Sequence, residues 1–498
     1  MEIMLEVDVQ IACKIVDLKQ SPVVRWRGPC LRERMNGEAA SKPVNLMASS
    51  NSRSYGLCYK PMRGERRLEA TTITYQGTLV TKKPKSTSKS KPNAALKTRR
   101  FEGMRTAILD AAAWQFNEHG VKGAALIDIA AAVGLVTSGI TYYFQKKEDL
   151  AAACLLTSIA ETKALVGQAL EAPNVPKRVE RFFSLLAELL ASIERGERPT
   201  LISFSDTRSL PDALASTIFS AYVDLFRSVR TLLKGVDAPE LSHDALNART
   251  HLLLSIANNF SGWSERCEPS QYARLAERVS DAVLHGIVDP SFTSSDPDTL
   301  VLLEPAAASD ETSESFLRAA TELVNEQGYR GASVDKISAL LNATKGKFYY
   351  YNETKFDLVT DCFERSFEVQ RHFLSQAERT KGTSNTKIAA VTTSLIRFQM
   401  SDRGPLLRGS GFSALPGQEQ RLRVFRSMER VIERMANLFI DGFLDSSVRA
   451  QDPTISASTL YSAINAASEL RNWVPGLTPD DVDRLYVRPS LLGLLCDE

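Results

Sequence analysis

The sequence predicts an all-α protein built from two similar units in tandem, and three observations support that fold class. Apolar residues recur at helical spacing through long segments from about residue 104 onward. The composition, 43% hydrophobic and 24% charged, is that of a globular protein. The chain also repeats itself, because a shift of 208 residues aligns 108–150 with 316–358 without a gap and leaves fifteen of the 43 pairs identical. We therefore expect two helical units of about 190 residues each.

The order of elements in the first unit predicts a helix-turn-helix followed by a helical body. A long helix stops at Gly120, a short helix covers "ALIDIAAAV", and a second short helix, "TSGITYY", precedes a long run that begins at "KEDL". The predicted organisation is an irregular extension at 1–80, a basic flexible arm at 81–103, helix-turn-helix domains at 104–150 and 312–358, helical bodies at 151–289 and 359–498, and a linker at 290–311.

The amino-terminal region differs from the rest in pattern and in charge. Residues 1–80 show no sustained period, and one hypothesis is that they lie upstream of the true start, with Met62 or Met104 initiating the working protein. Residues 82–105 carry nine basic side chains against one acidic, whereas the chain from 106 onward has a net charge of −10. This basic stretch is either a solvated linker or an arm that neutralises nucleic-acid phosphates.

Several function classes find no support in the sequence. Neither the five histidines nor the seven cysteines have the spacing of a metal site, so we expect no metal and no cofactor. No H-E-x-x-H, G-x-S-x-G or Walker-type motif is present, and we expect no enzyme activity. No uninterrupted apolar run approaches the roughly 18–20 residues of a membrane span, and the acidic start does not look like a secretory signal. We therefore expect a cytoplasmic protein without a membrane partner.

One segment of each unit resembles a known family. Gly120, Ile129-Ala130, Gly134, the tyrosines with Phe144, and Lys147-Glu148-x-Leu150 follow one another as in the amino-terminal domain of the TetR/AcrR family of bacterial transcriptional regulators. Both units match the pattern in register over about 50 residues, and the bodies match in general helical character. The resemblance implies that the helix-turn-helix domains bind double-stranded DNA, that the bodies hold a small-molecule effector and dimerise, and that repression is more usual than activation.

The family pattern also assigns residue roles. A recognition helix enters the major groove with its amino-terminal part, so small and polar side chains there reach base edges while the next turn meets phosphates. By this resemblance, base contacts come from Thr137, Ser138, Thr141 and Tyr142 in the first unit and from Lys345, Gly346, Tyr349 and Tyr350 in the second. Backbone contacts come from Tyr143 and Lys147, and from Tyr351 and Lys355. Phe144 is expected in the core.

The two units depart from the family pattern in different places. Ala125 lacks the hydroxyl of a helix N-cap, whereas Ser333 supplies one in the second unit. Asn342 replaces the turn glycine, and asparagine tolerates a left-handed turn well. Asn352 stands where Phe144 stands in the first unit.

These differences leave more than one function open. Two unlike recognition helices in one chain suggest an intramolecular pseudo-dimer that binds two unlike half-sites, although a homodimer of chains is also possible. The alternative from another class is an interaction protein whose helix-turn-helix domains have lost DNA binding. The effector and its contacts cannot be assigned from apolar stripes, and Phe260, Trp263 and Trp473 are only weak candidates.

Overall fold

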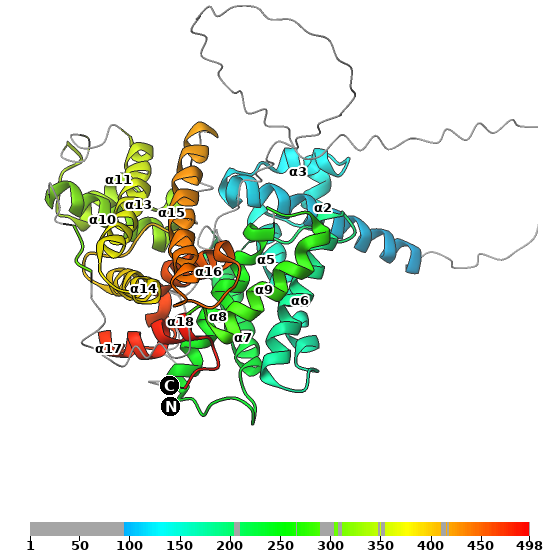
Figure 1. Ribbon diagram of the computed structural model, residues 1–498. Helices are drawn as coiled ribbons and strands as arrows, with labels where there is room; N and C mark the ends of the chain where they lie inside the picture. Colours follow the sequence, from blue (N-terminus) through cyan, green and yellow to red (C-terminus); the bar gives the residue numbers. More distant parts are fainter. Residues whose placement is uncertain are drawn as a thin grey trace, which may run out of the picture. The chain divides into compact units, whose positions relative to one another are not determined.

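The computed structural model describes residues 94–203, 210–264, 266–288, 303–306, 311–346, 349, 354–409, 415 and 418–497. Every regular element in these ranges is helical (Figure 1), which confirms the predicted all-α fold. The predicted extension at 1–80, most of the basic arm and most of the linker lie outside the described residues. So do Tyr350, Tyr351 and Asn352, and the predictions for them stay untested.

The first unit follows the predicted order of helices. Its helix-turn-helix domain comprises α2 (Ala94–Gly123), α3 (Leu126–Ala132) and α4 (Thr137–Tyr143). Its body comprises α5 (Lys147–Ala169), α6 (Val175–Glu194), α7 (Asp212–Leu232), α8 (His243–Ser264), the short helix η2 (Pro269–Gln271) and α9 (Tyr272–His285). The backbone of Gly120 has φ +68° inside α2, so the regular helix ends where the sequence predicts.

The second unit repeats this order. Its described elements are α10 (Glu311–Gly331), α11 (Val334–Leu340), α13 (Lys355–Arg379), α14 (Ser384–Met400), α15 (Gln418–Leu444), α16 (Pro453–Ala466), η4 (Ala467–Asn472), α17 (Pro479–Val482), η5 (Asp483–Val487) and α18 (Arg488–Leu492). The register persists beyond the aligned segment. Buried Cys154 and Cys362, 208 residues apart, donate to the carbonyl oxygens of Leu109 and Leu317, also 208 apart.

The body of each unit is a bundle held by a phenylalanine-rich core. In the first unit α5 packs against α6 and α7, and α6 packs against α9, with Phe182, Phe183 and Phe260 fully buried. In the second unit α13 packs against α14 and α15, and α15 packs against α16. Burial of each large apolar side chain stabilises the fold by roughly 1.5–3 kcal/mol.

Two helices differ from the sequence-based expectation. Helix α2 begins at Ala94, so residues 94–103, expected in the flexible arm, are helical. Alanine, leucine, lysine and arginine predominate at 94–100, and all four are strong helix formers. Helix α5 is long and apolar enough to cross a membrane by length and composition alone, but half of its most apolar window is buried inside the protein, where it packs on α6 and α7. We interpret α5 as a core helix of the bundle.

Candidate nucleic-acid interface

The turn between α3 and α4 has the geometry of a helix-turn-helix. The axes of the two helices differ by 92°, close to the right angle typical of the motif. Gly134 allows this turn with φ +69°, a backbone conformation in which glycine has no steric penalty. The turn is closed by the amide of Leu135, which donates to the carbonyl oxygen of Ala130 at 2.9 Å.

The second unit builds the same turn from different residues. Asn342 replaces the glycine and adopts φ +50°, which confirms the expected left-handed residue at this position. The equivalent closing bond joins the amide of Ala343 to the carbonyl oxygen of Ser338 at 2.8 Å. The predicted capping difference is also confirmed, because Ser333 Oγ accepts from the amide of Lys336 at 3.2 Å whereas Ala125 offers no side-chain cap.

In the first unit the predicted base-contacting side chains lie on the surface. Thr137, Ser138 and Thr141 are exposed, and Tyr142 is 75% exposed. Thr141 Oγ1 donates to the carbonyl oxygen of Ser138 at 3.0 Å, so its hydroxyl is held against its own helix. None of the four is used in the core of the domain, and their contacts with bases remain a prediction.

The three consecutive aromatic residues at the end of α4 have different environments. Phe144 is buried, which confirms the prediction of a core residue, and the guanidinium of Arg105 lies 5.3 Å from the centre of its ring. Tyr143 is half-buried and its ring stacks on that of Phe101, with 4.6 Å between centroids. Tyr142 points the larger part of its ring to solvent.

The two matching lysines bind carbonyl oxygens of their own domains. Lys147 Nζ donates to the carbonyl oxygen of Ala124 at 2.9 Å, and Lys355 Nζ donates to that of Tyr329 and lies 4.1 Å from the centre of the Tyr329 ring. Both side chains are half-buried. The structure thus gives Lys147 a role in joining α5 to the residue after α2, and Lys355 a role in joining α13 to the last turn of α10.

The described part of the second recognition surface carries a charged side chain, which the first recognition helix lacks. Lys345 and Gly346 are exposed, and Tyr349 is 54% exposed. Lys345 Nζ lies 2.6 Å from a carboxylate oxygen of Asp335, and this carboxylate raises the pKa of the lysine. Both side chains are largely exposed, so the pair adds little to stability.

Each helix-turn-helix domain is joined to its body by an asparagine at the equivalent position of the repeat. Asn117 Nδ2 donates to the carbonyl oxygen of Leu201 at 2.9 Å, while Asn117 Oδ1 accepts from the amide of Ser203 at 2.9 Å. Asn325 makes the same two bonds, to the carbonyl oxygen of Leu406 and from the amide of Arg408, at 2.9 and 3.0 Å. One amide side chain therefore positions the loop between the second and third body helices in both units.

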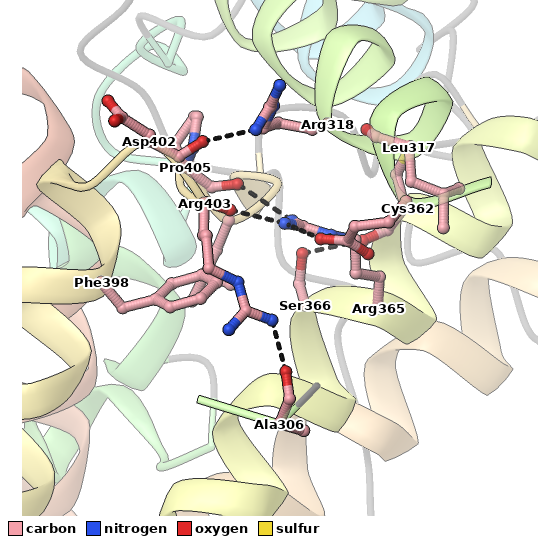
Figure 2. Close-up of polar contacts among 12 residues, drawn as sticks. Ala306, Leu317, Arg318, Cys362, Arg365, Ser366, Phe398, Asp402, Arg403 and Pro405 are labelled. Carbon is pink, nitrogen blue, oxygen red and sulfur yellow. Dashed lines mark hydrogen bonds and ion pairs between the residues drawn. The ribbon is translucent and has the colours of Figure 1, made fainter. Parts of the chain in front are cut away.

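The second unit adds an arginine cluster to this junction (Figure 2). Arg365 on α13 is 5% exposed and donates to the carbonyl oxygens of Arg403 and Pro405 at 2.6 and 3.2 Å. Its guanidinium also pairs with Glu314 on α10 at 2.6 Å. Figure 2 further shows Arg318, which donates to the carbonyl oxygen of Asp402 at 2.7 Å. The loop before α15 is therefore bound to both α10 and α13.

In the first unit the matching side chain accepts a hydrogen bond from the loop instead of donating one to it. Asp110 lies 208 residues before Arg318, and its carboxylate accepts from the amide of Thr200 at 2.7 Å. The position that matches Arg365 is Thr157, which bonds to a carbonyl oxygen of its own helix. At these two matching positions the second unit therefore has two arginines where the first has an aspartate and a threonine.

The ends of the two bodies interlock through a pair of glycines. Gly286 follows α9 with φ +75°, and Gly493 follows α18 with φ +92°. A Cβ on Gly286 would collide with the backbone of Leu492, and one on Gly493 with the carbonyl oxygen of Leu284. Backbone bonds run both ways between these segments, from Ile287 to Leu491 and from Leu494 to Val283, each at 2.8 Å. Close backbone approach here requires glycine on both sides.

Buried side chains extend this contact between the bodies. Arg249 on α8 is 1% exposed and donates to the carbonyl oxygen of Leu494 at 2.7 Å. Asn247, two residues earlier in the same helix, donates to the carbonyl oxygen of Trp473 at 3.1 Å. The Trp473 ring stacks on Phe226 of α7, with centroids 3.4 Å apart and planes 5° apart. Helices α8 and α9 also pack directly on α16.

Sequence reasoning did not identify the residues that join these parts. Asn117 and Asn325 belong to the identical pairs of the repeat, and that identity was the available signal for a shared role. The glycine pair stands in similar short segments, "LHGIV" and "LLGLL", at the ends of the two bodies. Within the described residues, no group of three His, Cys, Asp or Glu side chains is placed to hold a metal ion.

The fold and the two exposed recognition surfaces define a protein of the helix-turn-helix DNA-binding class. Residues 108–154 and 316–362 both match the model of the bacterial regulatory proteins, tetR family. These segments run from within α2 into α5 and from within α10 into α13. The chain thus carries two tandem helix-turn-helix domains of the TetR type, each matched by this family model.

Several solved structures are similar to part of this chain. Apo AibR has 18% identity and a TM-score of 0.30, covering 36% of this chain and 99% of that one. A TetR/AcrR-family transcriptional regulator from Thermobifida fusca YX-ER1 has 22% identity and a TM-score of 0.28, covering 37% and 98%. The regulator FadR from Bacillus subtilis, in complex with stearoyl-CoA, has 15% identity and a TM-score of 0.28, covering 36% and 97%. No curated protein matches this chain.

Proposed function

We propose that this protein is a cytoplasmic repressor that binds an operator through two unlike half-sites, one for each unit of a single chain. A small-molecule effector bound by the helical bodies would release it from the DNA. The observation that carries the proposal is the contact between the two bodies, centred on Gly286 and Gly493. This contact joins the two units within one chain, as a homodimer interface joins two chains.

An intramolecular pseudo-dimer has a direct consequence for the DNA sequence. Two identical recognition helices bind a palindrome, whereas here the first presents neutral Thr137 and Ser138 and the second presents Lys345 and Gly346. A lysine can donate to guanine in the major groove, but threonine and serine accept several bases. We therefore expect one half-site to be richer in guanine than the other.

We assign the DNA-contact roles of individual residues as follows. In the first unit Thr137, Ser138, Thr141 and Tyr142 would contact bases, and Tyr143 with Lys147 would contact phosphates. In the second unit the equivalent residues are Lys345, Gly346, Tyr349 and Tyr350 for bases, and Tyr351 with Lys355 for phosphates. Exposure of Thr137, Tyr142, Lys345 and Tyr349 supports these assignments. Residues 82–105 would add sequence-independent attraction to the phosphates.

Analytical ultracentrifugation combined with footprinting tests the proposal. A single chain should bind one DNA duplex and protect two unlike half-sites whose centres lie about 34–36 Å apart, one turn of the double helix. Substitution Thr137→Ala should weaken protection of one half-site, and Lys345→Ala that of the other. A dimer of chains that protects a perfect palindrome would refute the pseudo-dimer.

The alternative is an interaction protein built from degenerate TetR-like units. The pairing of Lys345 with Asp335, and of Lys147 and Lys355 with backbone carbonyls, is the observation that favours it. Fluorescence-polarisation titration with genomic and random DNA at two salt concentrations separates the two functions. Binding that weakens steeply with salt and prefers a subset of genomic sequences supports the regulator, and absence of binding to either DNA supports the alternative.

A further inference from the structure

An aromatic cluster joins the first recognition helix to the beginning of α2. Phe101 stacks on Tyr143 with 4.6 Å between ring centroids and an interplanar angle of 26°. The Tyr142 ring meets both of the others edge-on, at 6.1 Å from Phe101 and 5.3 Å from Tyr143. Phe101 remains 40% exposed in this arrangement, so the cluster lies at the surface.

The position of Phe101 follows from helical spacing. Phe101, Arg105 and Ile108 lie on one face of α2, at intervals of four and three residues. Ile108 is buried, Arg105 lies over the Phe144 ring, and Phe101 meets Tyr143. This face therefore meets the end of α4 and the residue after it through Phe101 and Arg105, about one turn apart, and Phe101 lies upstream of the family-matched segment that begins at 108.

Basic residues directly precede this aromatic contact. Arg99 and Arg100 lie in the same helical turn as Phe101, and both are exposed. The positions 208 residues later are Ala307, Ala308 and Ser309, and α10 carries Glu311 and Glu314 in its first turn instead. The second unit thus has neither the aromatic residue nor the arginines in its sequence.

We propose that the amino-terminal turns of α2 form part of the DNA-binding surface of the first unit alone. Phe101 is a positioning residue: it holds Tyr143 against α2 and limits the orientations of Tyr142. Arg99 and Arg100 bind phosphates beside the first half-site. The chemistry is that of duplex DNA, because a planar guanidinium group beside a recognition helix can bind phosphate oxygens through two parallel hydrogen bonds. This inference rests on the proposed function.

Three variants test the positioning role of Phe101. Phe101→Ala should weaken binding of a duplex that contains the mapped site by about 2- to 10-fold, the value of one aromatic pair, and should leave the salt dependence unchanged. Phe101→Trp should restore affinity because it keeps the stacking. Trp114→Ala is the matched control, since Trp114 is an exposed aromatic residue of the same helix that contacts His119.

The arginines are tested by the salt dependence of the same titration. The double variant Arg99→Gln, Arg100→Gln should flatten the slope of log K against log salt by about two units, because two phosphate contacts are lost. Hydroxyl-radical footprints should change at the first half-site only. The full chain is used throughout, and circular dichroism confirms that the helical content of each variant matches that of the wild type.

The outcomes separate this inference from the proposed function. If the wild-type chain binds its site but Phe101→Ala binds equally well and the arginine variant keeps the wild-type slope, the inference is overturned and the proposed function stands. If the wild-type chain shows no salt-dependent binding to any duplex, the proposed function fails and the inference fails with it. Weakened protection of the second half-site in Phe101→Ala would also contradict the inference.

Discussion

We expect the contact between the two bodies to depend on pH through His251. Its Nε2 lies 2.9 Å from the carbonyl oxygen of Ala466, and because a carbonyl only accepts, Nε2 carries the proton of the neutral ring. The side chain is 1% exposed and stacks on Tyr486. Burial lowers the pKa of His251 to about 4; the hydrogen bond to Ala466 opposes this shift and the charge of Arg408 adds to it.

The lowered pKa of His251 sets both the direction and the size of the change in folding stability with pH. In the unfolded chain the pKa of the imidazole is 6.5, so as the pH falls the unfolded state binds the proton first. The stability linked to neutral His251 is therefore complete above about pH 6.5 and is lost as the pH falls toward 4. Linkage gives a loss of about 2 kcal/mol between pH 8 and pH 5, and about 3 kcal/mol when the loss is complete.

Urea denaturation of wild type and His251→Gln at pH 8 and pH 5 measures this loss. The glutamine amide can still donate to the carbonyl of Ala466 but does not titrate. Carboxylates that titrate in both proteins cancel in the comparison, so the wild type should lose about 2 kcal/mol more than the variant between the two pH values. His285→Gln, at the exposed end of α9, is the control and should behave like the wild type. Equal pH dependence of wild type and His251→Gln would refute the reasoning.

Three further substitutions test the contact between the bodies, the junction of the second helix-turn-helix domain with its body, and the DNA-binding surface of the first unit. Gly493→Ala should lower the free energy of unfolding by roughly 2 kcal/mol or more, because its Cβ would meet the carbonyl of Leu284; an unchanged thermal midpoint would contradict the interlocked ends. Asn325→Ala should cost about 1–3 kcal/mol and speed hydrogen exchange in the loop before α15, and unaltered exchange would argue against this joint. Lys147→Gln should flatten the salt slope of DNA binding by about one unit, whereas Lys163→Gln on the exposed face of α5 should not; equal slopes would remove the phosphate contact.

The parts of the candidate interface that depend on local backbone geometry could be predicted from the sequence. Gly134 and Asn342 take positive φ values, and Ser333 caps its helix, because these requirements are set within one turn of the chain. Phe144, the extended residue that follows α4, is buried as its place in the family pattern predicted. The bond from Lys147 to Ala124 was not predictable, since it depends on where the loop after α2 lies.

The sequence by itself determined that this protein is helical, that it contains two tandem TetR-like units, and which short helices carry the exposed polar residues. Periodicity and an internal repeat report these features directly, because each depends on neighbours a few residues apart. Only the tertiary structure decided how Asn117 and Asn325 hold their bodies, how Phe101 meets the recognition helix, and how Gly286 and Gly493 close the contact between the units. These contacts join residues about 40 to more than 200 positions apart, and a spacing pattern carries no information about which distant side chains will meet.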